Sequence, residues 1–157
     1  MNGRIITIFI VVMSFINISI FGQDPFAGKD QAIENLEMKL LEFKASNSGL
    51  CVSEETANTY NIMEGKSLKI KITLFLMSAY GIIVATDNNT ESLKIEIIND
   101  NQEIIAEKVL KFGDKDIVEF SAEYTGEYLI KITPLKVLGS DSIKMSWISW
   151  AVLYDDY

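Results

Sequence analysis

The clearest indication of the fold is the segment "EYTGEYLIKITP", residues 123–134. Gly126 lies in a tight turn, where glycine adopts a positive φ without steric cost. We expect the Tyr128 ring to fill the end of a β-sandwich and its hydroxyl to reach backbone groups, as a tyrosine corner does. Pro134 has no amide hydrogen to donate, so the strand should end there or become an edge strand. Beyond the turn, every second residue is apolar, which is typical of a strand with one buried face: Tyr128, Ile130 and Ile132.

Further runs of this kind follow one another along the chain. They alternate apolar and polar residues, or are continuously apolar, and they are rich in β-branched and aromatic residues. They span residues 67–75, 80–86, 92–98, 103–112, 117–122 and 143–154. Turn-forming residues separate these runs and no helical run intervenes, so the sheets should be antiparallel. The sequence therefore predicts a mainly β domain over residues 50–157, an antiparallel β-sandwich or jelly-roll.

A different period precedes the strands. In "DQAIENLEMKLLEFKAS", residues 30–46, apolar side chains recur at spacings of three and four: Ile33, Leu36, Leu40 and Phe43. This spacing predicts one N-terminal amphipathic helix within residues 24–49. Its apolar face either packs on the β domain, or binds a partner or a second copy of the chain.

Residues 1–23 read as a targeting segment, a signal peptide. Arg4 gives a positive start, residues 5–21 are mostly apolar, and Gly22 is a plausible cleavage point. The apolar run lies between the roughly 7–15 residues of a signal-peptide core and the about 20 residues of a membrane span. We favour a cleaved export signal, which predicts a secreted, periplasmic or cell-envelope protein. A retained N-terminal anchor is the alternative, and no other membrane contact is expected.

Charge and composition exclude several classes of function. The net charge of −8 over 157 residues argues against nucleic acid, because phosphate contacts need a basic patch. The chain has no histidine, which removes the commonest general base and ordinary zinc ligation. Cys51 is the only cysteine, so an internal disulfide is excluded; it is either a small buried hydrophobe or half of an intermolecular bridge. We therefore predict a protein that is not an enzyme and has no cofactor, apart from the calcium considered below.

The chain also resembles a known family. Phe120, Ala122, Gly126, Tyr128 and Ile130 match a closing pattern F-x-A-x-x-x-G-x-Y-x-I, and Tyr80 is the aromatic residue that opens the second strand. Over residues 62–133 the sequence resembles the bacterial pre-peptidase C-terminal family. That resemblance implies a small secreted β-sandwich. The family often has Asp-x-Asp before its third strand, whereas this chain has Asp87-Asn88-Asn89, and the helix is not part of the family pattern.

Two turns rich in oxygen ligands suggest a cation. Calcium takes six to eight oxygens, often from such loops. The candidate metal ligands are Asp87, Asn89, Glu91, Asp114 and Asp116. Lys115 would oppose binding at the second turn if it pointed inward, and Asx turns explain both stretches without metal.

The last strand carries two tryptophans, Trp147 and Trp150, on opposite faces because they are three residues apart. Lys144 and Ser146 share the parity of Trp150, so we expect Trp150 to look outward. Tyr154 lies on the same face. Either the helix covers this face, or Trp150 and Tyr154 form a binding surface for a sugar or a partner.

These observations predict an exported, non-enzymatic β-sandwich that acts as an accessory or protein-interaction module of the cell envelope or the extracellular space. The alternative is a carbohydrate- or calcium-binding module, with a glycan in place of a protein partner.

Overall fold

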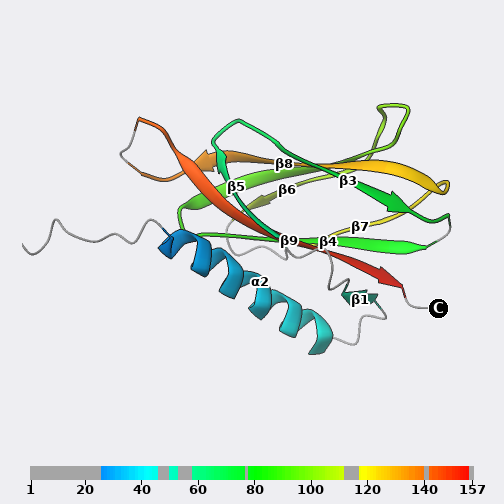
Figure 1. Cartoon of the computed structure of the whole chain (residues 1–157), viewed down its shortest axis with the longest axis horizontal. Helices are drawn as coiled ribbons and strands as arrows, with labels where there is room; N and C mark the ends of the chain where they lie inside the picture. The colour runs from blue at the N-terminus through cyan, green and yellow to red at the C-terminus, as the bar shows by residue number, and fades with distance from the viewer. Residues whose placement is uncertain are drawn as a thin grey trace, which may run out of the picture.

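The computed structural model describes residues 26–45, 50–52, 58–76, 78–111, 117–139 and 142–155. Within these ranges the protein is a mainly β sandwich of two antiparallel sheets with one helix against it, which confirms the predicted fold class (Figure 1). The elements are α2 (Ala27–Ala45), β1 (Leu50–Val52), β2 (Asn58–Met63), β3 (Leu68–Leu74), β4 (Ala79–Thr86), β5 (Thr90–Ile98), β6 (Ile104–Lys111), β7 (Ile117–Ser121), β8 (Gly126–Val137) and β9 (Met145–Asp155).

The strands pair in a nested order. β5 pairs with β6, β4 with β7, β3 with β8, and β2 with β9, as in a long hairpin that has been rolled up. The β4–β9 and β5–β8 pairs then join these hairpins into two layers. Sheet A has the order β2-β9-β4-β7, with β1 beside the other end of β9, and sheet B has the order β3-β8-β5-β6. This nesting is a jelly-roll.

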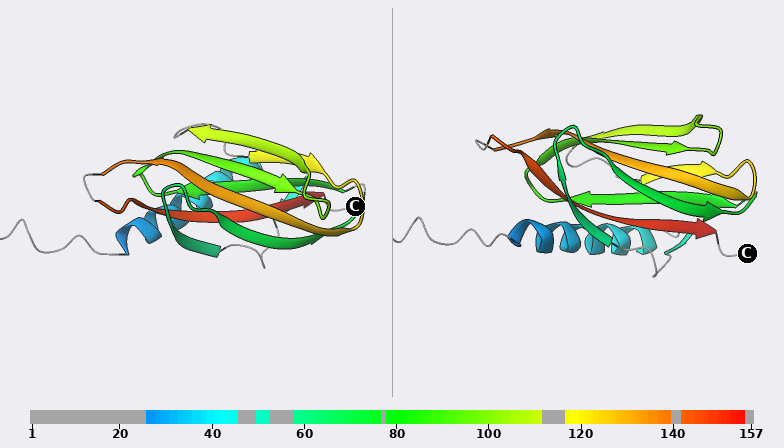
Figure 2. Two further views of the ribbon diagram at one scale, coloured as in Figure 1. Left: turned by 90° about the horizontal axis from the view of Figure 1, so that it is seen from above. Right: turned by 45° about the horizontal axis from the view of Figure 1, so that its top comes forward.

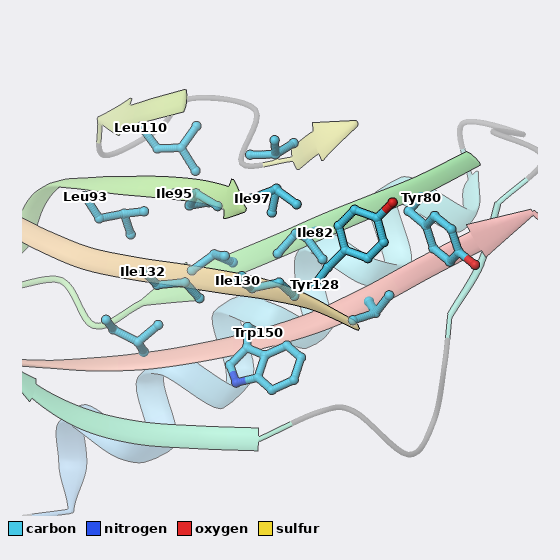
Figure 3. Close-up of a cluster of buried hydrophobic side chains, with 14 of the residues drawn as sticks. Tyr80, Ile82, Leu93, Ile95, Ile97, Leu110, Tyr128, Ile130, Ile132 and Trp150 are labelled. Carbon is cyan, nitrogen blue, oxygen red and sulfur yellow. The ribbon is translucent and has the colours of Figure 1, made fainter. Parts of the chain in front are cut away.

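The core lies between the two sheets, where alternate side chains of each strand meet (Figure 3). Its centre consists of fully or almost fully buried residues: Ile82, Val84, Leu93, Ile95, Ile97, Tyr128, Ile130, Ile132, Ile148 and Trp150. β4 is buried on both faces along nearly its whole length, as its continuous apolar run indicates.

The predicted tyrosine corner is present. Tyr128 is fully buried, and its hydroxyl donates to the Tyr124 carbonyl oxygen at 3.0 Å and accepts from the Tyr124 amide at 3.3 Å. The Tyr124 and Tyr128 rings stack with centroids 5.1 Å apart. Gly126 does not have the expected positive φ. It is needed for space instead, because a Cβ there would lie 2.8 Å from the Tyr124 ring.

β8 does not end at Pro134, as the sequence suggested, but continues to Val137. The pairing of β5 with β8 shifts register on either side of Ser92, next to the Leu93–Pro134 pair. A bulge of this kind accommodates a residue that has no amide to donate. The Pro134 carbonyl oxygen still accepts a hydrogen bond, from the amide of Gly65 at 2.8 Å.

α2 packs on the outer face of sheet A, over β4 and β9 (Figure 2). Leu36 is buried there against Ala151 and Leu153 of β9, and Leu40 and Phe43 pack on the same cluster. The prediction that the helix packs on the β domain is therefore confirmed. Residues 1–23, the predicted targeting segment, and the side chain of Cys51 lie outside what the structure describes.

Candidate functional site

The turn between β4 and β5 holds a buried polar network around Asp87. The Thr90 hydroxyl donates to Asp87 Oδ1 at 2.9 Å and lies 2.5 Å from the Ser146 hydroxyl. The amide of Trp147 donates to Asp87 Oδ2 at 3.3 Å, and burial raises the pKa of Asp87 above its usual value. These bonds fix the turn to the start of β9, so the Asp87 carboxylate has a structural role.

The predicted calcium ligands of this turn do not converge on one point but have different partners. Asp87 points into the buried network, whereas the Glu91 carboxylate pairs with the Lys136 ammonium at 2.7 Å. Asn89 is exposed, and its carbonyl oxygen accepts from the amide of Leu138 at 2.6 Å. In the described ranges no three acidic or cysteine side chains gather as a metal site would require. Asp114 and Asp116 lie outside the described residues, so that part of the prediction stays untested.

The prediction that Trp150 faces outward is wrong. Trp150 is 3 % exposed and belongs to the core between the sheets, together with Ile148 and Val152. Tyr154 packs against the same core and is partly exposed. The helix covers the opposite face of β9, which carries Trp147 and the buried residues Ser149, Ala151 and Leu153.

The prediction for Trp150 was wrong because it assumed that Lys144 and Ser146 lie on a solvent-exposed face of β9. Lys144 precedes β9, and Ser146 is fully buried in the network with Thr90. The face of β9 under the helix carries uncharged side chains, among them the small residues Ser149 and Ala151. At Gly28 an added Cβ would lie 2.6 Å from Trp147 Cδ1, which shows how closely the helix approaches β9.

Polar side chains of α2 fasten it to the backbone of β4. Asn35 Nδ2 donates to the Thr86 carbonyl at 2.8 Å, and Lys39 Nζ donates to the Val84 carbonyl at 3.1 Å. Burial lowers the pKa of Lys39 from 10.5 to about 8, although nearby Glu42 opposes this shift. One outer face of the sandwich is therefore closed by apolar packing and by hydrogen bonds.

The outer face of sheet B, here called the open face, has no element packed on it in the part of the chain that the structure describes (Figure 2). A row of four directly paired residues crosses all four strands: Lys69 of β3, Lys131 of β8, Glu96 of β5 and Glu107 of β6. We call these four residues the charged row. Two lysines therefore lie side by side at one end, and two glutamates at the other.

Ion pairs compensate most of the charged row. Glu96 accepts from the Lys131 ammonium at 2.7 Å and from the Lys94 ammonium at 3.1 Å, and Lys94 also pairs with Glu107 at 2.9 Å. The hydrogen bond from Lys131 is the main cause of a lowered pKa of Glu96. Lys69 takes part in no side-chain hydrogen bond or ion pair that the described residues show. It lies directly opposite Lys131, an arrangement of like charges that is destabilising in a sheet.

Next to the charged row runs an apolar row of three paired residues, Leu129, Ile98 and Ile104. Leu129 and Ile98 are half-buried, and Ile104 is 50 % exposed. The open face thus offers apolar contact beside an uncompensated lysine. The sequence alone does not reveal this surface, because strand pairing determines which lysines and glutamates become neighbours.

Comparisons with known proteins add little. No family model matches the chain, and no curated protein matches it. Among solved structures the chain is similar to PliG of Aeromonas hydrophila, described as a periplasmic lysozyme inhibitor of g-type lysozyme. The identity is 8 %, the TM-score is 0.43, and the match covers 62 % of this chain and 84 % of that one. A likeness of this size carries no argument about fold or function.

None of the helices in the described ranges has the length and apolar character that crossing a bilayer requires.

Proposed function

We propose that this protein is a non-enzymatic module, exported to the cell envelope or beyond, that binds another protein through the open face of sheet B. The observation that carries the proposal is Lys69, a lysine without an ion pair among the described residues, beside a half-buried apolar row on a sheet face that no described element covers. The repulsion between Lys69 and Lys131 in the free protein is offset if a partner places a negative charge next to Lys69.

The charge of the whole molecule makes this surface distinctive. The chain carries 22 acidic and 14 basic residues, yet lysines dominate the β3 side of the open face. A basic edge on an acidic protein steers acidic partners to one orientation. Export and the resemblance to the pre-peptidase C-terminal family remain predictions from the sequence, and they are consistent with such a module.

Site-specific photocrosslinking tests the proposal. A photoreactive residue placed at Leu129, on the open face, should label a protein from the envelope or secreted fraction of the native host. The same residue at Glu37, exposed on α2, should not. Lys69→Glu should weaken labelling about tenfold, the order of effect expected for one interfacial charge. The matched reversal Lys44→Glu, at the end of α2, should leave it unchanged.

Two results would refute the proposal. One is labelling from Glu37 as strong as from Leu129. The other is an adduct from Leu129 that proteases do not degrade and glycosidases do, which would make the ligand a glycan.

A further inference from the structure

The two edges of the sandwich are closed to different degrees. At the β6–β7 edge, the Lys108 ammonium of sheet B donates to the Ile117 carbonyl of sheet A at 3.0 Å. At the β2–β3 edge, side chains that pack on the core remain partly exposed: Ile62, Leu68, Ile70 and Ile72. Tyr60 lies on the same side of β2 as Ile62 and is 41 % exposed. We call these five residues the seam.

A buried hydrogen-bond donor lies beside the seam. Trp150 pairs with Asn58 of β2, and its indole extends from β9 on the side where β2 lies (Figure 3). Its Nε1 atom is buried without a hydrogen-bond partner, the one such side-chain atom in the described residues. A buried donor without an acceptor destabilises the folded protein. Such a group calls for an explanation, and an acceptor supplied by a ligand is one.

The backbone at the seam is also open. Among the described strands, β3 pairs with β8 alone, so its second edge has no strand beside it. An edge strand offers unpaired amide and carbonyl groups to another extended chain. β3 has seven residues, so it accommodates a segment of about the same length.

The side chains of β3 specify what that segment should be. Lys69 and Lys71 are exposed on the outer face, and opposite charges on directly paired residues are stabilising. A second copy of β3, paired in the antiparallel direction, would place lysines near lysines, so the edge resists self-association. On the inner face the segment would meet Leu68, Ile70 and Ile72, which favour apolar side chains.

We propose that β3 receives an extended segment of a partner protein in which acidic and apolar residues alternate. Its acidic side chains face the lysines on the open face, and its apolar side chains close the seam. One inward side chain carries an oxygen that accepts a hydrogen bond from Trp150 Nε1. This inference rests on the proposed function and specifies where and how the protein partner binds.

The test uses nine-residue peptides that alternate glutamate and valine, with one valine replaced by asparagine at each inward position in turn. Binding is followed by the two indole N–H signals in ¹⁵N-correlated NMR spectra, assigned with a Trp147→Phe variant. The Trp150 signal should move downfield with at least one peptide, and the Trp147 signal should stay in place. Peptides with lysine in place of glutamate should bind at least about tenfold more weakly.

Two variants serve as matched controls. Lys69→Glu, on β3, should abolish the shift, whereas Lys111→Glu, on the opposite edge strand of the same sheet, should not. Trp150→Phe keeps an aromatic ring and loses the donor, so it should weaken binding several-fold. If this variant does not fold, the shift of the Trp150 indole signal in the wild-type protein remains the test of the hydrogen bond.

A Trp150 signal that no peptide moves overturns the inference, as does equal binding of the lysine peptides. The proposed function stands or falls separately. Crosslinking from Leu129 that persists without any peptide effect would keep the open face as the binding surface and reject strand addition at β3. A dimer that forms through β3 would show a second copy to be the occupant and would also reject the inference.

Discussion

The two outer faces of this sandwich belong to antiparallel sheets of the same domain, yet α2 covers one and no described element covers the other. On sheet A, β4 and β9 present small or aliphatic side chains such as Ala85, Ala151 and Leu153, and α2 packs on them. On sheet B, β5 and β8 present Glu96 and Lys131, and no described element covers them. A strand that is apolar on both sides thus indicates a covered face, and strict alternation indicates an open one.

The largest expected effect comes from removing an apolar contact under the helix. Leu36→Ala should lower the free energy of unfolding by about 2–5 kcal/mol, because Leu36 is buried and leaves a cavity. The matched substitution Leu129→Ala, on the half-buried apolar row, should lower it by less than about 1.5 kcal/mol. Urea denaturation followed by circular dichroism measures both. Equal losses would mean that the open face is covered as tightly as the other.

Adding volume should distinguish the faces in the same way. Ala151 is fully buried between β9 and α2, so Ala151→Leu should destabilise the protein by about 1–3 kcal/mol through overpacking. Thr73→Leu, exposed on the outer face of β3, should change stability by no more than about 0.5 kcal/mol. Thermal melting of the two variants provides the comparison, and a stable Ala151→Leu protein would show that the helix is loosely packed.

The sequence predicted the sheet architecture and the tyrosine corner, because both depend on short-range alternation and one turn. It did not predict β1, which has three residues and is too short to show a period, or β2, whose polar residues at an edge leave no clear period. It placed Trp150 on the wrong face because Ser146 is a buried polar residue, and burial of Ser146 depends on Thr90, far away in the sequence. The charged row could not be predicted for the same reason, because its four residues become neighbours only through the pairing register of four strands.

A smaller effect concerns the lysine under the helix. The pKa of Lys39 is lowered to about 8 in the folded protein, below its ordinary value of 10.5, so the unfolded chain holds this proton more tightly. Stability should therefore rise with pH between about 8 and 10.5, relative to a Lys39→Met variant that has no proton to lose. Urea titrations of both proteins across this range measure the difference. A constant difference would place Lys39 in solvent and remove it from the contact between α2 and β4.

The smallest effect, and the one that belongs to the open face, comes from Glu96. Its pKa is lowered mainly by the hydrogen bond from Lys131, so the folded state binds the proton less tightly than the unfolded chain. The stabilisation is present above the ordinary value of 4.5 and should fade as the pH falls through the lowered value. Glu96→Gln should lack this dependence at a cost of no more than about 1 kcal/mol at neutral pH, because the ion pairs are partly exposed.

Glu127→Gln provides the matched control, since the Glu127–Lys71 pair is more than half exposed on the same face. It should keep the pH dependence of the wild-type protein, because Glu96 and Lys131 are unchanged in it. If both variants behave alike, the charged row is an ordinary solvated surface. If only Glu96 matters, Lys131 is already committed to a partner within the protein, and Lys69 is the lysine of this row that remains available to a second molecule.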